Sequence, residues 1–128
     1  MRLPAIAELL GRILLAAIFV AGGAAKLGDP AAMAGIMQAA GVPPVLALPT
    51  GLFEVAAGLA LIAGWQTRIV ALLLAGFCLV SGLLFHLQPA DRMQMIMFMK
   101  NVALTGGFLV LAYQGAGPIS LDARRTRR

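Results

Sequence analysis

Two residues of opposite charge, Glu54 and Lys100, each lie inside a long apolar run of the sequence. An ionised side chain at the centre of a bilayer costs about 2.5–3.5 kcal/mol on insertion scales, so such residues pair, line a hydrated cavity or perform a function. A carboxylate can carry protons, and an ammonium can donate hydrogen bonds to a carbonyl or an anion. The sequence therefore predicts an interior polar site in which Lys100 is the partner of Glu54.

The depth of each polar residue in the membrane, estimated from its position in its apolar run, identifies further candidates for this site. At a rise of about 1.5 Å per residue, Glu54 lies roughly 15 Å and Lys100 about 12 Å from the outer ends of their runs. Arg12, about 10 Å from the inner end of its run, is a second candidate cation for Glu54. Asn101 follows Lys100 and offers an amide at the same level.

Two polar residues near the outer rim complete the set. His86 is either a proton carrier at the mouth of the site or an interfacial residue that caps its span. Lys26 either joins the site or only extends to the lipid headgroups. The candidate ligand-binding or proton-transfer residues are thus Glu54, Lys100, Asn101, His86, Arg12 and Lys26.

Composition determines the elements that must hold these residues. Hydrophobic residues make up 61% of the 128 residues and charged residues only 12%, whereas about a quarter of a soluble domain is charged. The mean hydropathy is +0.94. We expect an all-α, polytopic membrane four-helix bundle, since about 20 helical residues cross the hydrocarbon core. The expected spans are residues 5–26, 45–65, 67–87 and 93–113, in a single transmembrane domain over 1–118, followed by a basic tail at 119–128.

A short interfacial helix is predicted between the first two spans. Asp29 and Pro30 have the form of an N-cap and a first-turn proline, and Gly41 follows the expected helix over residues 30–40. It is too short to cross a bilayer. It is either a lid over an outward-facing pocket or a plain connector that shields helix ends.

Small residues and one proline suggest how the spans pack. Pro49 removes a backbone hydrogen bond, so a bend there is expected to open space beside Glu54. Stripes of small residues predict close helix contacts. They comprise Ala17, Ala21 and Ala25 on the first span and Ala56, Ala60 and Gly64 on the second.

The charges favour one orientation. Arginines gather at one side of the expected topology, four of the ten basic residues in the tail alone, and the net charge is +5. The positive-inside rule then predicts cytoplasmic termini, with the tail touching anionic lipid. Only the tail has a composition that suggests disorder, and nothing favours a nucleic-acid partner. A cleavable signal peptide is the alternative for the first span, but Glu8 and Arg12 interrupt its apolar run and are expected to pair.

Other chemistry finds little support in the motifs. The single cysteine, Cys78, lies in an apolar span and is expected in the core, and no Cys-x-x-Cys pair or glycine-rich nucleotide fingerprint occurs. The alternation from Met93 to Met99 could suit copper(I). On a helix these methionines split between two sides, so packing is the better explanation and no metal site is expected.

The order and spacing of several short motifs resemble the DoxX family. They are Arg12-x-Leu-Leu with Phe19, Gly22 and Lys26; Glu54 with Gly58 and Gly64-x-x-Thr67-Arg68; His86; Lys100-Asn101 with Gly106-Gly107; and Gly115-x-Gly117-x-x-Ser120-Leu121-Asp122. The resemblance implies a four-helix protein of the bacterial cytoplasmic (inner) membrane. It also implies a link to membrane oxidoreduction, including a quinone-reducing thiosulfate oxidation system and an oxidative-stress complex.

Three functions remain open at this point. The first is an accessory subunit of a membrane oxidoreductase that binds a quinone or a small sulfur-containing molecule and relies on a partner subunit for electrons, because the chain has no intrinsic cofactor. The second is a carrier or channel component for a small solute or proton. The third is a structural assembly factor with a locked ion pair. The chain has no self-contained catalytic motif, and the small-residue stripes make a homodimer one option.

Overall fold

Every regular element in the described part of the chain is a helix. The computed structural model describes residues 2–128, and within them the elements are α1 (Leu3–Gly28), α2 (Pro30–Ala39), the 3-10 turn η1 (Pro44–Leu46), α3 (Ala47–Ala63), α4 (Thr67–Ser81), the π-helical turn η2 (Gly82–His86), α5 (Arg92–Gln114) and α6 (Leu121–Thr126). Four helices are long and apolar enough to cross a membrane: Leu3–Gly28, Pro44–Ala63, Thr67–His86 and Arg92–Gln114. The predicted all-α fold with four candidate membrane spans is confirmed.

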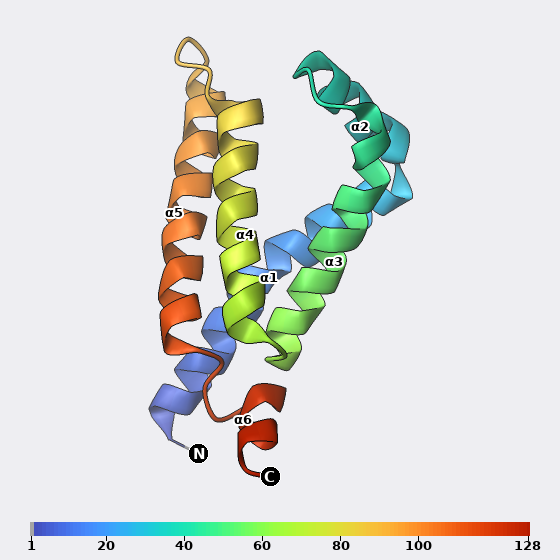
Figure 1. Cartoon of the computed structure of the whole chain (residues 1–128). Helices are drawn as coiled ribbons and strands as arrows, with labels where there is room; N and C mark the ends of the chain where they lie inside the picture. Colours follow the sequence, from blue (N-terminus) through green and yellow to red (C-terminus); the bar gives the residue numbers. More distant parts are fainter. Residues whose placement is uncertain (1) are drawn as a thin grey trace.

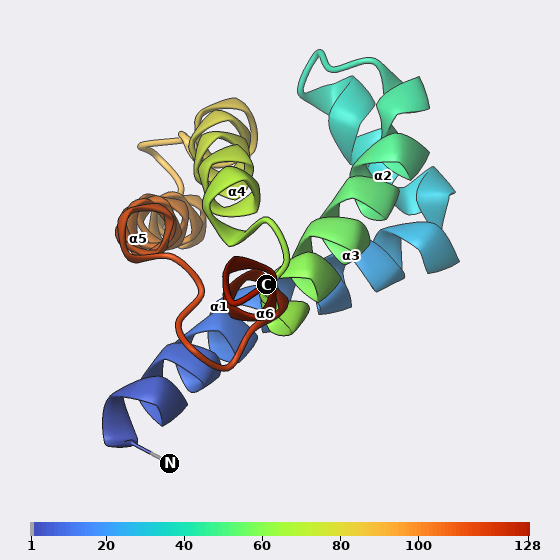
Figure 2. The ribbon, with the colours of Figure 1, turned by 60° about the horizontal axis from the view of Figure 1, so that its bottom comes forward.

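The spans are arranged as two helix pairs. α1 packs along α3, and α4 packs along α5, while contacts between the pairs are sparser (Figure 1). Both ends of the chain lie at one end of the molecule, which we call the termini end; α2 and the α4–α5 connection mark the opposite end, the loop end. The two pairs meet toward the termini end and diverge toward the loop end (Figures 1 and 2).

An apolar core joins the two helix pairs on the termini side of the point where they diverge. Phe19 of α1 makes edge-to-face contacts with Phe108 of α5 at 5.4 Å and Phe77 of α4 at 6.2 Å between ring centroids. Cys78 is buried in the same core, as predicted. The buried cluster consists of Ala16, Phe19, Ala57, Leu61, Ala71, Leu74, Ala75, Cys78 and Phe108.

Glycines bring α1 and α3 into backbone contact. A Cβ added at Gly23 would lie 2.8 Å from the carbonyl oxygen of Gly51 and 2.7 Å from Cγ2 of Val55. A Cβ at Gly58 would lie 2.7 Å from Cγ2 of Val20. These two glycines, one on each helix, therefore allow the helices to approach as closely as they do.

The predicted small-residue stripes are not the main contact between these helices. Ala17, Ala21 and Ala25 on α1 are exposed, as is Ala56 on α3. Both helices carry small residues on more than one face, and spacing alone does not identify which face meets the partner. The contact uses the glycine face instead, where Gly51 and Gly58 of α3 meet α1.

The bend expected at Pro49 does not occur, since α3 continues unbroken from Ala47 to Ala63. α3 begins at Ala47, directly after η1, so Pro49 lies in the first turn. Backbone N–H groups in a first turn have no partner within the helix, and a proline there removes no hydrogen bond.

The short helix α2 forms as its sequence predicts. The Asp29 side chain accepts a hydrogen bond from the N–H of Ala32 at 3.2 Å, and Pro30 is the first helical residue. Gly41, with a φ of 75°, follows the last turn. Asp29 thus stops α1 and starts α2 within one residue, which places α2 beside the loop end of α1 and α3.

Polar contacts close the termini end. The Asp122 carboxylate accepts hydrogen bonds from the backbone N–H groups of Gln66 at 2.8 Å and Thr67 at 2.9 Å, at the start of α4. The Asp122 N–H donates to the carbonyl of Gly64 at 2.9 Å. Arg68 donates to the last carbonyls of α5, including that of Ala112 at 3.0 Å. The tail therefore forms α6 and docks on the bundle, contrary to the disorder that its composition suggests.

Burial and hydrogen bonding act oppositely on Asp122. Burial raises the pKa of this carboxyl. The backbone hydrogen bonds from Thr67 and Gln66, together with the charge of Arg125, lower the pKa by more than burial raises it, so the pKa lies below its ordinary value. A carboxyl whose pKa is lowered by folding stabilises the native state above its unfolded pKa, and this stability is lost as the pH falls through the folded pKa.

The glycine contact yields the first prediction. Gly23→Ala should lower the free energy of unfolding by about 1–3 kcal/mol, because the added methyl meets backbone atoms that cannot move aside. Gly11→Ala on the same helix is the matched control, since no atom lies within 4 Å of an added Cβ there. Unfolding of both variants in detergent micelles measures the difference; equal stabilities would contradict the close approach.

The docked tail yields the second prediction. Asp122→Ala should lower the free energy of unfolding at neutral pH by about 0.5–2 kcal/mol, the usual cost of removing a helix cap. The difference in stability from the unmodified protein should narrow as the pH falls below about 4, the ordinary pKa of an aspartate, and should be lost once the pH is below the lowered pKa of the folded state. Asp122→Asn keeps an acceptor and should keep more stability. Unfolding curves at several pH values test this, and a gap that is independent of pH would refute it.

Candidate functional site

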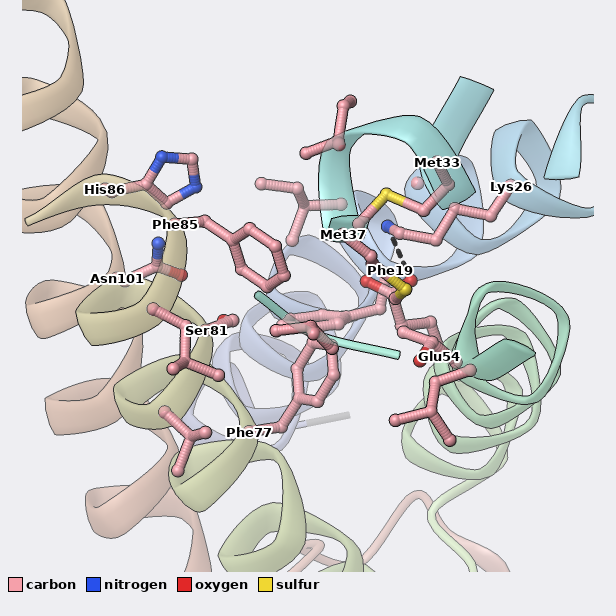
Figure 3. A pocket seen from close by; sticks show the side chains of 18 of the residues that line it. Phe19, Lys26, Met33, Met37, Glu54, Phe77, Ser81, Phe85, His86 and Asn101 are labelled. Atoms are coloured by element: carbon pink, nitrogen blue, oxygen red, sulfur yellow. Dashed lines mark ion pairs between the residues drawn. The ribbon is translucent and has the colours of Figure 1, made fainter. Parts of the chain in front are cut away.

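A cavity of about 400 Å³ lies between the two helix pairs at the loop end. Its wall is mostly apolar, with polar side chains contributed by both pairs (Figure 3). The lining residues are Ile18, Phe19, Gly22, Lys26, Met33, Ile36, Met37, Val42, Leu46, Thr50, Glu54, Phe77, Val80, Ser81, Leu84, Phe85, His86, Lys100, Asn101 and Leu104. Five of the six residues predicted for the site therefore line one cavity; Arg12 does not.

The carboxylate of Glu54 forms its ion pair with Lys26. The Lys26 Nζ lies 2.7 Å from Glu54 Oε2, and only 7% of the Glu54 side chain and 19% of the Lys26 side chain are exposed. The pair follows from the close approach of α1 and α3, which places residue 26 beside residue 54. Gly22 lies one turn before Lys26, where an added Cβ would be 3.9 Å from Glu54 Oε1.

This pair corrects the expected partner of Glu54. Within residues 2–128, neither Lys100 nor Arg12 lies within ion-pair distance of Glu54, and Glu8 and Arg12 do not form the expected pair. Lys26 therefore does not simply extend to the headgroups. Depth along a span was similar for several cations, but only packing of α1 against α3 determines which of them reaches the carboxylate.

Lys100 lines the same cavity without an anionic partner among the described residues. Its Nζ contacts the Sδ of Met97, on its own helix, at 3.7 Å. A thioether is a weak acceptor and does not balance a positive charge. The half-buried ammonium consequently gives the cavity a positive charge that the Lys26–Glu54 pair leaves uncompensated.

His86 ends α4 through the π-helical turn η2. Its Nδ1 lies 2.7 Å from Oε1 of Gln94 on α5. An amide oxygen can only accept a hydrogen bond, so Nδ1 of His86 is the donor in this contact. Gln94 was not among the sequence-predicted residues; its place in the first turn of α5, across a short loop from His86, is the signal that could have identified it.

Asn101 lies one residue beyond Lys100 but is more deeply buried. Its Nδ2 donates to the carbonyl of Met97 at 3.2 Å, which fixes the orientation of the amide. Figure 3 shows Asn101, His86 and Ser81 on one side of the cavity and the Lys26–Glu54 pair on the other. The polar groups therefore form two separate clusters on the two helix pairs.

Aromatic and methionine side chains separate the two polar clusters. Phe19, Phe77 and Phe85 lie between them, and Met33 and Met37 of α2 lie near Lys26 (Figure 3). Met37 is 3% exposed, so the underside of α2 is part of the wall. Of the two alternatives for the short helix, its position over the cavity agrees with a lid-like cover.

Arg12 serves the termini end instead. Its side chain is 1% exposed, and its Nη2 donates to the carbonyl of Ile119. An added Cβ at Gly64, whose φ is 69°, would clash with Arg12 Nη1. Gly64 and Arg12 therefore fit together as a structural contact between α1, the end of α3 and the tail.

The donor set and the shape of the cavity define what it can hold. Cavities of about 300–1,000 Å³ with apolar walls and a few polar groups are typical of small-molecule sites. Lys100 can donate to a carbonyl or an anion, and Glu54 can exchange a proton. Among residues 2–128, no group of three or more His, Cys, Asp or Glu side chains could hold a metal ion.

Comparisons with known proteins agree with the membrane fold. The DoxX family model matches residues 7–87. The chain is 39% identical to the inner membrane protein YqjF of Escherichia coli (strain K12) over 121 residues, covering 94% of this chain and 93% of that protein. It is 34% identical to the inner membrane protein YphA of the same organism, covering 91% and 88%. No solved structure matches the chain. The extent of these matches shows that this chain is a member of the DoxX family.

Proposed function

We propose that this DoxX-family protein is a membrane-embedded subunit that binds a small molecule in the cavity between its helix pairs. The observation that carries the proposal is the Lys100 ammonium, half-buried in an apolar cavity without an anionic partner among the described residues. A charge in that position costs free energy unless a ligand or water compensates it. A carbonyl or an anion at Lys100 supplies that compensation.

A quinone headgroup is our first candidate for the ligand. Its planar ring fits the aromatic wall formed by Phe19, Phe77 and Phe85, since such rings favour offset or edge contacts. Its two carbonyls lie on opposite sides of the ring. One can accept from Lys100 on α5, while the other faces the Lys26–Glu54 pair. The polar clusters on the two helix pairs support this choice.

Redox turnover of such a ligand requires a partner subunit. The only cysteine, Cys78, is buried in the core, and the sequence has no motif for an electron carrier. An oxidoreductase partner would deliver or receive electrons while Glu54 and His86 exchange protons with the ligand. We infer that the termini face the cytoplasm, because arginines gather at the termini end, so the cavity lies in the outer half of the membrane. Homodimer formation stays a prediction.

A proton or solute carrier is the second candidate. Glu54 and His86 are both titratable and line the same cavity, as a proton relay would require. Flux into proteoliposomes in the absence of any electron donor would favour this function. Ligand binding without flux would favour the binding subunit.

Substitution at the unpaired cation tests the binding function. Lys100→Met should weaken quinone affinity about 10-fold or more, because a hydrogen bond from a charged donor contributes about 1.5–3 kcal/mol. Glu54→Gln should weaken it as well. Arg92→Met is the matched control, since Arg92 begins the same helix, is exposed and does not line the cavity. Titration calorimetry in micelles measures these affinities; unchanged binding in both site variants would refute the assignment.

Charge reversal separates binding from a purely structural role. Lys26→Glu and Glu54→Lys should each lower the free energy of unfolding by about 3–5 kcal/mol, because each leaves like charges buried together. The double variant should recover most of that stability, since it restores an ion pair. Binding should stay impaired in the double variant, because the carboxylate has moved from α3 to α1. Full binding would instead show that the pair only joins α1 and α3. A structural assembly factor with a locked ion pair predicts that the double variant keeps full function.

A further inference from the structure

We propose that the cavity opens sideways into the bilayer, and that its occupant is an amphiphile with a hydrogen-bond-accepting headgroup and an apolar tail that extends between α3 and α4 into the lipid. This inference deepens the proposed binding function, on which its choice of occupant rests. It concerns the route into the site and the chemical class of the ligand.

The first observation is the exposure of the cavity wall itself. Leu46 is 42% exposed, Val80 55% and Leu84 51%, although all three line the cavity. Leu46 belongs to η1 on one helix pair, whereas Val80 and Leu84 belong to α4 and η2 on the other. The rim of the opening is therefore apolar on both sides. We call these three residues the portal.

The second observation is the depth of the portal. The span Thr67–His86 has 20 residues, which at about 1.5 Å per residue matches a hydrocarbon core of about 30 Å. Along this span Val80 lies about 9 Å from His86. Leu84 and Leu46 lie about 3 Å from the loop ends of their spans. The portal therefore extends from the membrane interface at the loop end to the depth of Val80, where it faces acyl chains, and an apolar rim is the surface expected there.

The third observation is what covers the cavity at the loop end. Met33, Met37 and Val42 line it from α2 and the segment that follows. Met37 is almost completely buried beneath α2. α2 therefore covers the cavity at the loop end, although Ile36 of α2 is itself 55% exposed, while the diverging helix pairs leave the side between α3 and α4 without a covering helix (Figures 1 and 2).

Polarity inside the cavity orients the occupant. Lys100 and Asn101 of α5 and His86 at the end of α4 line the cavity on the α4–α5 pair, and the three portal residues are apolar. An accepting headgroup placed at Lys100 then leaves its tail at the portal, where it can remain in lipid. Such a ligand need not cross water to enter the site.

Fluorescence quenching tests the portal without any quinone. In a Trp65→Phe background, the chain has no other tryptophan. Phe85→Trp and Ser81→Trp then each place a single tryptophan in the cavity wall. Each variant is reconstituted into phospholipids that carry brominated acyl chains, which quench tryptophan fluorescence. Two reporters are used so that one misfolded variant does not decide the result. Val110→Trp on the exposed face of α5 is the lipid-facing control, and Arg124→Trp on α6 is the water-facing control.

Lateral opening predicts a specific pattern. The cavity reporters should lose most of their fluorescence to brominated chains, comparably to Val110→Trp, and should resist iodide, unlike Arg124→Trp. Quenching by iodide but not by brominated chains would show an aqueous opening and would overturn the proposal. Resistance to both quenchers would show a closed cavity and would also overturn it.

Dibromostearic acid, an amphiphile with a carboxylate headgroup, tests the class of occupant. It should quench the Phe85→Trp reporter at low mole fraction, and the quenching should saturate. Lys100→Met should lower the apparent affinity about 10-fold, whereas Arg92→Met should leave it unchanged. Linear quenching that is unaffected by Lys100→Met would overturn headgroup recognition. Neither assay contains a quinone or an electron partner, so failure of quinone binding and failure of lateral entry are distinguished.

Discussion

Lys26 and Glu54 can neutralise each other because α1 and α3 approach to backbone contact at Gly23 and Gly58. Two ionised groups inside membrane-spanning helices would otherwise each bear the cost of removal from water. Their 2.7 Å contact joins α1 and α3 at the wall of the cavity. Glu54 is the only carboxylate among the described residues that line the cavity, so its pairing with Lys26 leaves Lys100 without an anionic partner there.

The two ends of the molecule use polar groups differently. At the termini end, Arg12, Arg68 and Asp122 satisfy backbone carbonyl and N–H groups at helix ends, so their charges serve architecture. At the loop end, Lys100 has no comparable structural bond, and its contact with a thioether leaves its donors available. Similar residue types therefore stabilise the fold at one end and leave binding capacity at the other.

The helices could be predicted from the sequence, but the contacts between them could not. Apolar run length predicted four spans, and Asp29 and Pro30 predicted α2, because span length and capping are local properties. The gathering of Glu54, Lys100, Asn101 and His86 around one site also agrees with the structure. The prediction that Lys100 is the partner of Glu54 was wrong, because depth along a helix does not determine which residue of a neighbouring helix lies beside it. Arg12 was placed with the site for the same reason, although Gly64 and the tail hold it elsewhere.

The distribution of buried apolar residues bears on the choice between binding and conduction. A proton or solute path must continue from the cavity toward the termini end. There Phe108, Leu61 and Leu74 are fully buried in the core that joins the helix pairs, and they offer no polar group for relay. Beyond them lies the guanidinium of Arg12, which stays protonated and repels a passing cation. A mostly apolar cavity with a few polar side chains, above an apolar core, suits a ligand that enters and leaves from the same leaflet, which favours the proposed binding subunit over a channel.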